Sequence, residues 1–342
     1  MQFGIFGGAA ARLVNITNEP QLYSAIVDYV CEAEELGFKS FFIAEHHFAG
    51  ISQISAVLNV LSFLAARTKT MRLGTAVSVL PWHNPALLVE QAATVDVLSG
   101  GRLELGLGRG YRRSEFDGFC IPFEEADERY TECIDFIRKA WPAKGRFSHH
   151  GKYWHFEDVL IEPAPVQVPH PPFWVGAGSP PSLRAAAAQD FNILLDQIAA
   201  PALIGERLQI YKTAVEEARG AYHPHRVGVT RAFHLTMNQA ERELAYQHRS
   251  TFILKAAELQ RDTKKQSSIG LPTSMEAIRE STEKAALIGK PDEIIRRIEA
   301  LQALGVEYIM LMDIALSHIG LRTFAREVMP AFAGSKAVAS AA

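Results

Sequence analysis

The chain alternates short apolar runs with longer segments of helical period, and it does so eight times. A run that is apolar at every position fits a strand covered on both faces, as in a parallel sheet. Eight strand–helix units predict a closed (β/α)8 TIM barrel, with an open, doubly wound sheet as the alternative. The runs are 1–7, 39–44, 72–80, 102–108, 172–178, 192–196, 227–236 and 307–313.

The segments between the runs carry the signals that begin and end helices. In 84–101, Asn84 is suited to cap the first turn, and a Gly-Gly pair is suited to end the helix. The segment 291–305 begins with proline and ends with glycine. In 126–141, apolar residues recur at steps of three and four, so we expect Cys133 to lie between this helix and the sheet.

Two segments interrupt the alternation. Residues 145–171 read as a small hairpin followed by a Pro-rich return before the fifth strand, and residues 260–288 begin polar and aperiodic after the seventh. Long insertions in a compact barrel are typically lids or binding loops, so we expect both to bound a substrate pocket. The sequence predicts a single domain over residues 1–334 and a flexible tail over 335–342.

Composition excludes several classes of function. The 342 residues are 48% hydrophobic with a formal net charge of −3, which indicates a globular protein with a large core. No block of Lys and Arg provides a footprint for nucleic acid or an anionic membrane. No apolar stretch is long enough to cross a bilayer, so we expect a cytoplasmic protein. Cys31, Cys120 and Cys133 form no Cys-x-x-Cys pair, so we expect neither a disulfide framework nor a zinc site.

The second run ends in Glu45-His46-His47-Phe48, where a barrel would place its chemistry. Adjacent residues of a strand point to opposite faces, so only one histidine can face the barrel mouth. We assign His46 to the site and a structural position to His47. For the same reason the pair cannot easily chelate one ion, and the chain contains no His-Glu-x-x-His motif. We therefore predict no metal site.

The fourth run continues as GLGRGYRRSEF, residues 106–116, which invites a dinucleotide-binding interpretation. Gly-x-Gly-x-x-Gly must turn directly into a helix for that role, whereas these glycines alternate along a strand. Alternating glycines leave one face of the strand bare, so a flat ligand can approach the backbone there. Arg109 is then placed to meet an anion.

A second element that could bind an anion is GAGSPPSLRAA, residues 176–186. Here glycines, including Gly178, lead into a helix whose first N–H groups and positive dipole end favour a phosphate. Ser179 and Ser182 are the hydroxyls at this position. Simple capping of the helix by these serines is the alternative interpretation.

Four stretches together resemble the bacterial luciferase-like flavin monooxygenases, over residues 1–332. The resemblance implies an (α/β)8 barrel that forms a homodimer or heterodimer and binds reduced FMN from a separate NAD(P)H-dependent flavin reductase. It also implies reaction of this flavin with O2 to a C4a-hydroperoxide, which oxygenates a small organic substrate. The stretches are EHHF, LGTAVSVLPWHNPALLVEQAATVDVLSGGRL, GLGRGYRRSEF and GKPDEIIRRIEALQALGV.

Matched position by position, the resemblance also implies site residues. A non-prolyl cis peptide beneath the flavin would join Ala76 and Val77. The reactive cysteine of luciferase corresponds to Gly108, which argues against light emission. The family's catalytic histidine falls on His46, its phosphate-binding arginines on Arg109 and Arg129, and its phosphate-binding hydroxyls on Ser179 and Ser182.

The chemistry implied by the resemblance needs a dry site and one group that can hold or release a proton. His46 suits this role because its pKa lies near neutrality, with Glu45 or a nearby carbonyl setting its tautomer. The flavin supplies the oxygen chemistry, and the protein orients and shields it. We expect four aromatic residues to bound the substrate pocket, namely Phe6, Phe48, Trp82 and Tyr111.

Two other functions fit the same residues. A related barrel reductase would use a deazaflavin for hydride transfer. A non-catalytic flavin-binding protein would keep the phosphate site without the chemistry, because a fold does not fix a function. The identity of the substrate depends on the loops 111–123, 145–171 and 260–288, whose specificity the sequence does not reveal.

Overall fold

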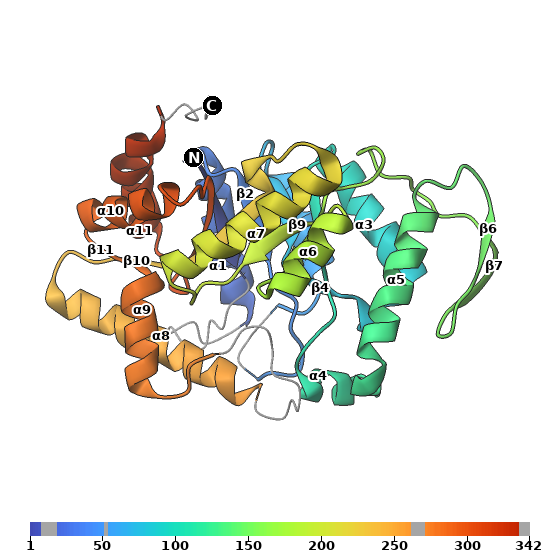
Figure 1. Cartoon of the computed structure of the whole chain (residues 1–342), viewed down its shortest axis with the longest axis horizontal. Helices are drawn as coiled ribbons and strands as arrows, with labels where there is room; N and C mark the ends of the chain where they lie inside the picture. Colours follow the sequence, from blue (N-terminus) through green and yellow to red (C-terminus); the bar gives the residue numbers. More distant parts are fainter. Residues whose placement is uncertain (8–18, 51–53, 261–270, 335–342) are drawn as a thin grey trace.

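A closed barrel of eight parallel strands forms the centre of the computed structural model, which describes residues 1–7, 19–50, 54–260 and 271–334 (Figure 1). Around the barrel the strand order is β1, β2, β3, β5, β8, β9, β10 and β12, and β12 pairs again with β1. The predicted (β/α)8 fold is therefore confirmed. The strands are β1 (Gln2–Gly7), β2 (Ser40–Ile43), β3 (Arg72–Thr75), β5 (Leu103–Gly108), β8 (Phe173–Gly176), β9 (Asn192–Leu195), β10 (Val227–Leu235) and β12 (Tyr308–Met312).

Helices cover the outside of the barrel (Figure 1). The longer ones are α1 (Glu19–Glu35), α2 (Val57–Arg67), α3 (Pro85–Ser99), α5 (Ala126–Ala140), α6 (Pro180–Ala188), α7 (Pro201–Arg219), α8 (Gln239–Glu258), α9 (Met275–Ala285) and α10 (Pro291–Gln302). Shorter elements are α4 (Arg113–Gly118), α11 (His318–Thr323), η2 (Leu80–Trp82), η3 (Phe123–Glu125), η4 (Pro224–Arg226), η5 (Phe324–Val328) and η6 (Met329–Phe332).

The predicted helix signals act as expected. The Asn84 side chain accepts hydrogen bonds from the amides of Ala86 and Leu87, at 3.0 and 3.3 Å, and caps α3. Gly100 ends that helix in the left-handed region, at φ 65°. Cys133 on α5 is fully buried within the layer between helices and strands, as its position on the apolar stripe predicted.

A separate cluster of large side chains fills the barrel interior. Phe42, Trp174, Leu194, Tyr308 and Met310 are buried against one another inside the strands. The barrel is therefore a packed core rather than a pore, and open space is left at its carboxyl-terminal mouth.

The prediction of one continuous strand over 72–80 is wrong, because the third run is divided. β3 ends at Thr75, the Ala76–Val77 peptide is cis, and a two-residue strand, β4 (Ser78–Val79), pairs with β5. The chain then enters η2. A continuous apolar run carries no signal for such an interruption, because each part of it is buried in turn.

The insertion 145–171 forms the predicted hairpin, with strands β6 (Phe147–His150) and β7 (His155–Val159). The hairpin packs on the outer side of α5, away from the barrel (Figure 1). Gln167, in the Pro-rich return, donates to the carbonyl of Leu103 at the amino-terminal end of β5. Our expectation that this insertion bounds the pocket is therefore wrong, because it lies outside α5 and towards the opposite end of the barrel.

The insertion 260–288 is largely regular structure where it is described. It contains α9 and a short strand, β11 (Leu287–Gly289), which extends the sheet by pairing with β10. Our expectation of a loop is thus wrong for 275–288, while residues 261–270 and the predicted tail 335–342 lie outside the described residues.

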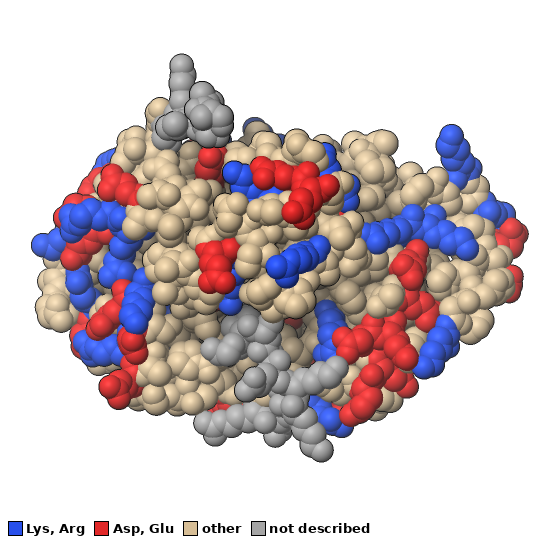
Figure 2. Space-filling view, viewed as in Figure 1, with Lys and Arg blue, Asp and Glu red and all other residues tan. Residues whose placement is uncertain are grey.

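The described helices include none long and apolar enough to span a membrane. On the face shown in Figure 2, Lys and Arg side chains are interspersed with Asp and Glu, and acidic side chains gather near α4 and α5. That face presents no extended basic surface of the kind that binds nucleic acid.

Candidate active site

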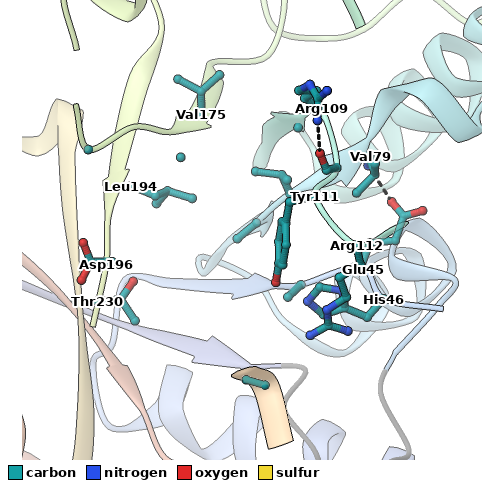
Figure 3. A pocket seen from close by; sticks show the side chains of 18 of the residues that line it. Glu45, His46, Val79, Arg109, Tyr111, Arg112, Val175, Leu194, Asp196 and Thr230 are labelled. Atoms are coloured by element: carbon teal, nitrogen blue, oxygen red, sulfur yellow. Dashed lines mark hydrogen bonds between the residues drawn. The ribbon is translucent and has the colours of Figure 1, made fainter. Parts of the chain in front are cut away.

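A cavity of about 600 Å³ lies at the carboxyl-terminal ends of the barrel strands, a size typical of sites for cofactors and small molecules. Each of the eight barrel strands, or the turn that follows it, supplies part of the lining. Figure 3 shows His46 and Tyr111 on one side and Val175, Leu194, Asp196 and Thr230 on the other. The strand-end lining comprises Phe6, Gly7, Glu45, His46, Ala76, Val77, Gly108, Arg109, Gly110, Tyr111, Val175, Gly176, Ala177, Gly178, Leu194, Leu195, Asp196, Gln197, Thr230 and Met312.

His46 faces this cavity and is oriented by Glu115. Its Nδ1 lies 3.0 Å from Oε1 of Glu115, and because a carboxylate only accepts, Nδ1 carries the proton and Nε2 is the basic nitrogen. Glu115 also accepts from the backbone amide of His47 at 2.9 Å and lies 3.5 Å from Nη1 of Arg112. Glu115, rather than the expected Glu45 or a carbonyl, therefore sets the tautomer.

Burial is the main cause that lowers the pKa of His46 below its usual value. The hydrogen bond to Glu115 opposes this decrease, and the positive charge of Arg112 adds to it. The imidazole is thus held neutral at pH 7, with Nε2 available to accept a proton.

Glu45 holds a separate hydrogen-bond network at the edge of the cavity. Its carboxylate lies 3.0 Å from Nε2 of His47 and 2.9 Å from Nε2 of His83, and it accepts from the amide of Val79 at 3.0 Å. Burial would raise the pKa of Glu45, but these hydrogen bonds outweigh it and lower the pKa to about 2. The adjacent-residue geometry predicted from the sequence is confirmed, since His46 lines the cavity while His47 points away and bonds to Glu45.

We expect His47→Ala to lower the free energy of unfolding by about 1–3 kcal/mol, because it leaves the buried Glu45 carboxylate with one fewer donor. Urea denaturation at pH 7 measures this loss. Because the pKa of Glu45 is lowered, its contribution is complete above the ordinary carboxyl range and disappears as the pH falls towards 2. A variant as stable as the parent chain would show that the network is not structural.

Only two of the four predicted pocket aromatics line the cavity, namely Phe6 and Tyr111. Phe48 is 65% exposed, and Trp82 stacks on Phe119 with ring centroids 5.3 Å apart. The Phe48 ring also lies 5.0 Å from Phe119. The prediction is therefore wrong for Phe48 and Trp82, which pack beside the site around His47 instead.

The non-prolyl cis peptide between Ala76 and Val77 is present, as predicted, and both residues line the cavity. A Cβ at Gly108 would lie 2.1 Å from Cγ2 of Val77, and one at Gly106 would lie 1.9 Å from the carbonyl oxygen of Thr75. These two glycines therefore make room for the neighbouring chain. Our expectation that the glycines expose the backbone to a flat ligand is therefore wrong for Gly106 and Gly108. The face of the strand left bare by these two residues is covered by Thr75 and Val77 instead.

Of the two predicted phosphate-binding arginines, only Arg109 lines the cavity. Its Nε and Nη2 pair with the Asp127 carboxylate, at 2.5 and 3.1 Å. Arg129 lies one turn into α5, where it pairs with Glu125 at 2.8 Å and covers the ring of Tyr153. The structure thus separates the two arginines in space, with Arg109 at the cavity and Arg129 against the hairpin insertion.

The serines predicted to bind phosphate form a capping box at the start of α6. Oγ of Ser179 accepts from the amide of Ser182 at 3.3 Å, and Oγ of Ser182 accepts from the amide of Ser179 at 3.1 Å. Pro180 and Pro181 have no N–H, so the expected row of unpaired helix amides is absent from this described segment. Gly178 lines the cavity, whereas the serine hydroxyls lie beside it.

Comparison with known proteins decides the family. A family model described as a luciferase-like monooxygenase matches residues 1–308.

The chain belongs to the luciferase-like monooxygenase family.

A flavin-dependent trigonelline monooxygenase, oxygenase component, of Acinetobacter baylyi is 27% identical and covers 98% of this chain and 97% of its own length. The family match and this relative confirm the resemblance and identify the protein as an oxidoreductase of the luciferase-like family.

Two solved structures share the fold at lower identity. The oxygenating constituent of 3,6-diketocamphane monooxygenase from Pseudomonas putida, in complex with FMN, is 18% identical with a TM-score of 0.78, covering 96% of this chain and 98% of that one. An F420-dependent secondary alcohol dehydrogenase is 17% identical with a TM-score of 0.74, at the same coverages. Proteins with this barrel fold thus include one in complex with FMN and one that depends on F420.

Proposed function

We propose that this protein is an FMN-dependent monooxygenase, which uses reduced FMN from a separate NAD(P)H-dependent reductase and O2 to oxygenate a small organic substrate in the cytoplasm. The observation that carries the proposal is the neutral His46, oriented by Glu115 towards a cavity built from all eight strand ends. The relative from Acinetobacter baylyi, named as an oxygenase component, supports a two-component system.

The residues of the cavity fit a flavin mononucleotide. A Cβ on Gly176 would meet nothing within 4 Å, so the end of β8 leaves open space for a ligand. Arg109 would bind the phosphate, helped by Gly178 and by the hydroxyls of Ser179 and Ser182 after they rearrange. Ala76 and Val77 would support the ring system from the side of β3.

The chain itself would bind and orient the cofactor and the substrate, exclude water from them, and transfer a proton through His46. Bound reduced FMN supplies the reaction with O2. The apolar lining from Leu107, Val175 and Leu194 excludes water, which would otherwise release the oxygen as peroxide. Nε2 of His46 takes up a proton from the reacting group or returns one to it, while Glu115 keeps the imidazole in the required tautomer.

The pH dependence should follow the lowered pKa of His46. We expect the product formed per FMN oxidised to stay constant near neutrality and to fall only at a pH below the usual range of histidine titration, because the pKa of His46 is lowered. Glu115→Gln should move the midpoint further down, because the hydrogen bond to the carboxylate raises this pKa. Single-turnover product yields across the pH range measure both. A midpoint above pH 7 would contradict the assignment.

A deazaflavin-dependent oxidoreductase is the second candidate, since an F420-dependent dehydrogenase has the same fold. Anaerobic titration of the protein with reduced FMN and with a reduced deazaflavin separates the two. The proposal expects tighter binding of reduced FMN, and selective binding of the deazaflavin would refute it. Tight FMN binding without any product from a substrate panel would indicate a non-catalytic flavin-binding protein. We also propose a homodimer or heterodimer, which light scattering tests.

A further inference from the structure

Two buried arginines stand behind the cavity wall that faces His46. Arg231 follows the cavity-lining Thr230 on β10 and is fully buried, and Arg249 on α8 is 4% exposed. Both lie beside the turn at Asp196 and Gln197, which follows β9 and lines the cavity. Figure 3 shows Asp196 and Thr230 on this wall, across the cavity from His46.

Neither arginine has a carboxylate partner among the described residues. Nη1 of Arg231 donates to the carbonyls of Asp196 and Thr230, at 3.0 and 3.4 Å, while its Nε and Nη2 find no acceptor in the part of the chain that the structure describes. Arg249 donates to the side-chain and main-chain oxygens of Gln197, the latter at 3.3 Å, and no described residue accepts from its Nε. Buried cations satisfied only by neutral carbonyls are costly, because their charge is not balanced.

The nearby carboxylate does not balance them either. Asp196 is paired with Arg207, whose Nη1 lies 2.5 Å away, and it also accepts from the amides of Ile198 and Ala199. Three guanidinium groups thus surround one carboxylate. Burial lowers the pKa of Arg249 to about 9, which still leaves it charged at pH 7. This side of the cavity is therefore electropositive.

Gln197 lies between the buried Arg249 and the cavity. Arginine can only donate, so the side-chain atom of Gln197 that faces Arg249 must be its oxygen. The amide nitrogen of Gln197 then remains as a donor at the cavity lining, polarised by the guanidinium behind it.

We propose that Gln197, backed by Arg249 and Arg231, binds a carboxylate of the substrate, so that the substrate is an organic acid held opposite His46. The bound carboxylate would supply the missing negative charge of the wall. This inference rests on the proposed function only in taking the occupant to be the substrate. The alternative occupant with the same acceptor chemistry is a ring carbonyl of the flavin.

The test uses benzoate as the anionic probe and benzyl alcohol as the neutral one, with the cofactor-free protein in calorimetric titrations. Benzoate should bind the parent chain more tightly than benzyl alcohol. Gln197→Glu should raise the Tm of the free protein, because it adds the missing counter-ion. The same change should lower the affinity for benzoate at least about tenfold. Benzyl alcohol should bind this variant as it binds the parent.

Gln189→Glu is the matched control, because Gln189 also accepts from an arginine, Arg138 at 3.4 Å, but on the surface. It should leave the affinity for benzoate unchanged. If Gln197→Glu does not fold, Gln197→Leu carries the test and should show the same loss of benzoate binding.

Three results would overturn the proposal. Benzoate could bind no more tightly than benzyl alcohol, the Gln197 variants could leave the affinity for benzoate unchanged, or these variants could lower the affinity for FMN and not that for benzoate. Binding of benzoate needs neither flavin nor turnover. Failure of this proposal is therefore distinguishable from failure of the proposed oxygenase function.

Discussion

Replacing His46 with alanine should leave the fold and the affinity for FMN intact and reduce product formation at least about a hundredfold, the usual range for loss of an acid–base group. Burial holds this imidazole neutral at the cavity, with its basic nitrogen directed away from its carboxylate partner. Without it, O2 consumed by the reduced cofactor should appear as hydrogen peroxide. Quantifying product and hydrogen peroxide from the same single turnover measures this change from product formation to peroxide release.

His47→Ala is the matched control for this prediction, because the neighbouring imidazole bonds to Glu45 and does not line the cavity. It should lose stability and keep the product yield of its folded fraction. Added imidazole should partly restore product formation to His46→Ala by entering the vacated space. If His46→Ala forms product at the parent yield, the histidine is only a buried polar residue of the barrel.

Arg109→Ala should weaken FMN about 10–100-fold and riboflavin hardly at all, because only FMN carries the phosphate that the guanidinium would bind. Fluorescence quenching of both ligands on the same preparation measures the difference. The phosphate would have to take the place of the Asp127 carboxylate, which now pairs with Arg109.

The pairing with Asp127 provides a control of opposite sign. Asp127→Asn should bind FMN as tightly as the parent chain or more tightly, because the competing carboxylate is removed. Arg129→Ala should have a smaller effect than Arg109→Ala, since Arg129 pairs with Glu125 and does not line the cavity. Equal weakening of FMN and riboflavin by Arg109→Ala would mean that this residue supports the pocket without contacting the phosphate.

Much of the barrel could be predicted because its signals are local. Runs such as 39–44 and 307–313 are buried on both faces, and the cap at Asn84 acts within one turn. The separation of His46 from His47 follows from the alternation of side chains along a strand. These features need no knowledge of what lies across the barrel.

The parts that were missed depend on contacts between distant segments. Glu115 reaches His46 across 69 positions, although its place in the charged cluster YRRSEF was a signal that chemistry lies there. Trp82 was expected in the pocket but packs on Phe119, because η2 interrupts the third run. Gln197 gave no sequence signal, since its importance comes from Arg249 on another element.

The measurement that tests the central claim most directly is a single turnover of the protein loaded anaerobically with reduced FMN and then mixed with O2. The absorbance of oxidised FMN should appear only after a delay, because the apolar lining of the cavity and His46 slow the unproductive release of peroxide. His46→Ala should shorten this delay. Oxidised FMN forming in one phase, at the rate of free reduced FMN and identically in both proteins, would contradict the account.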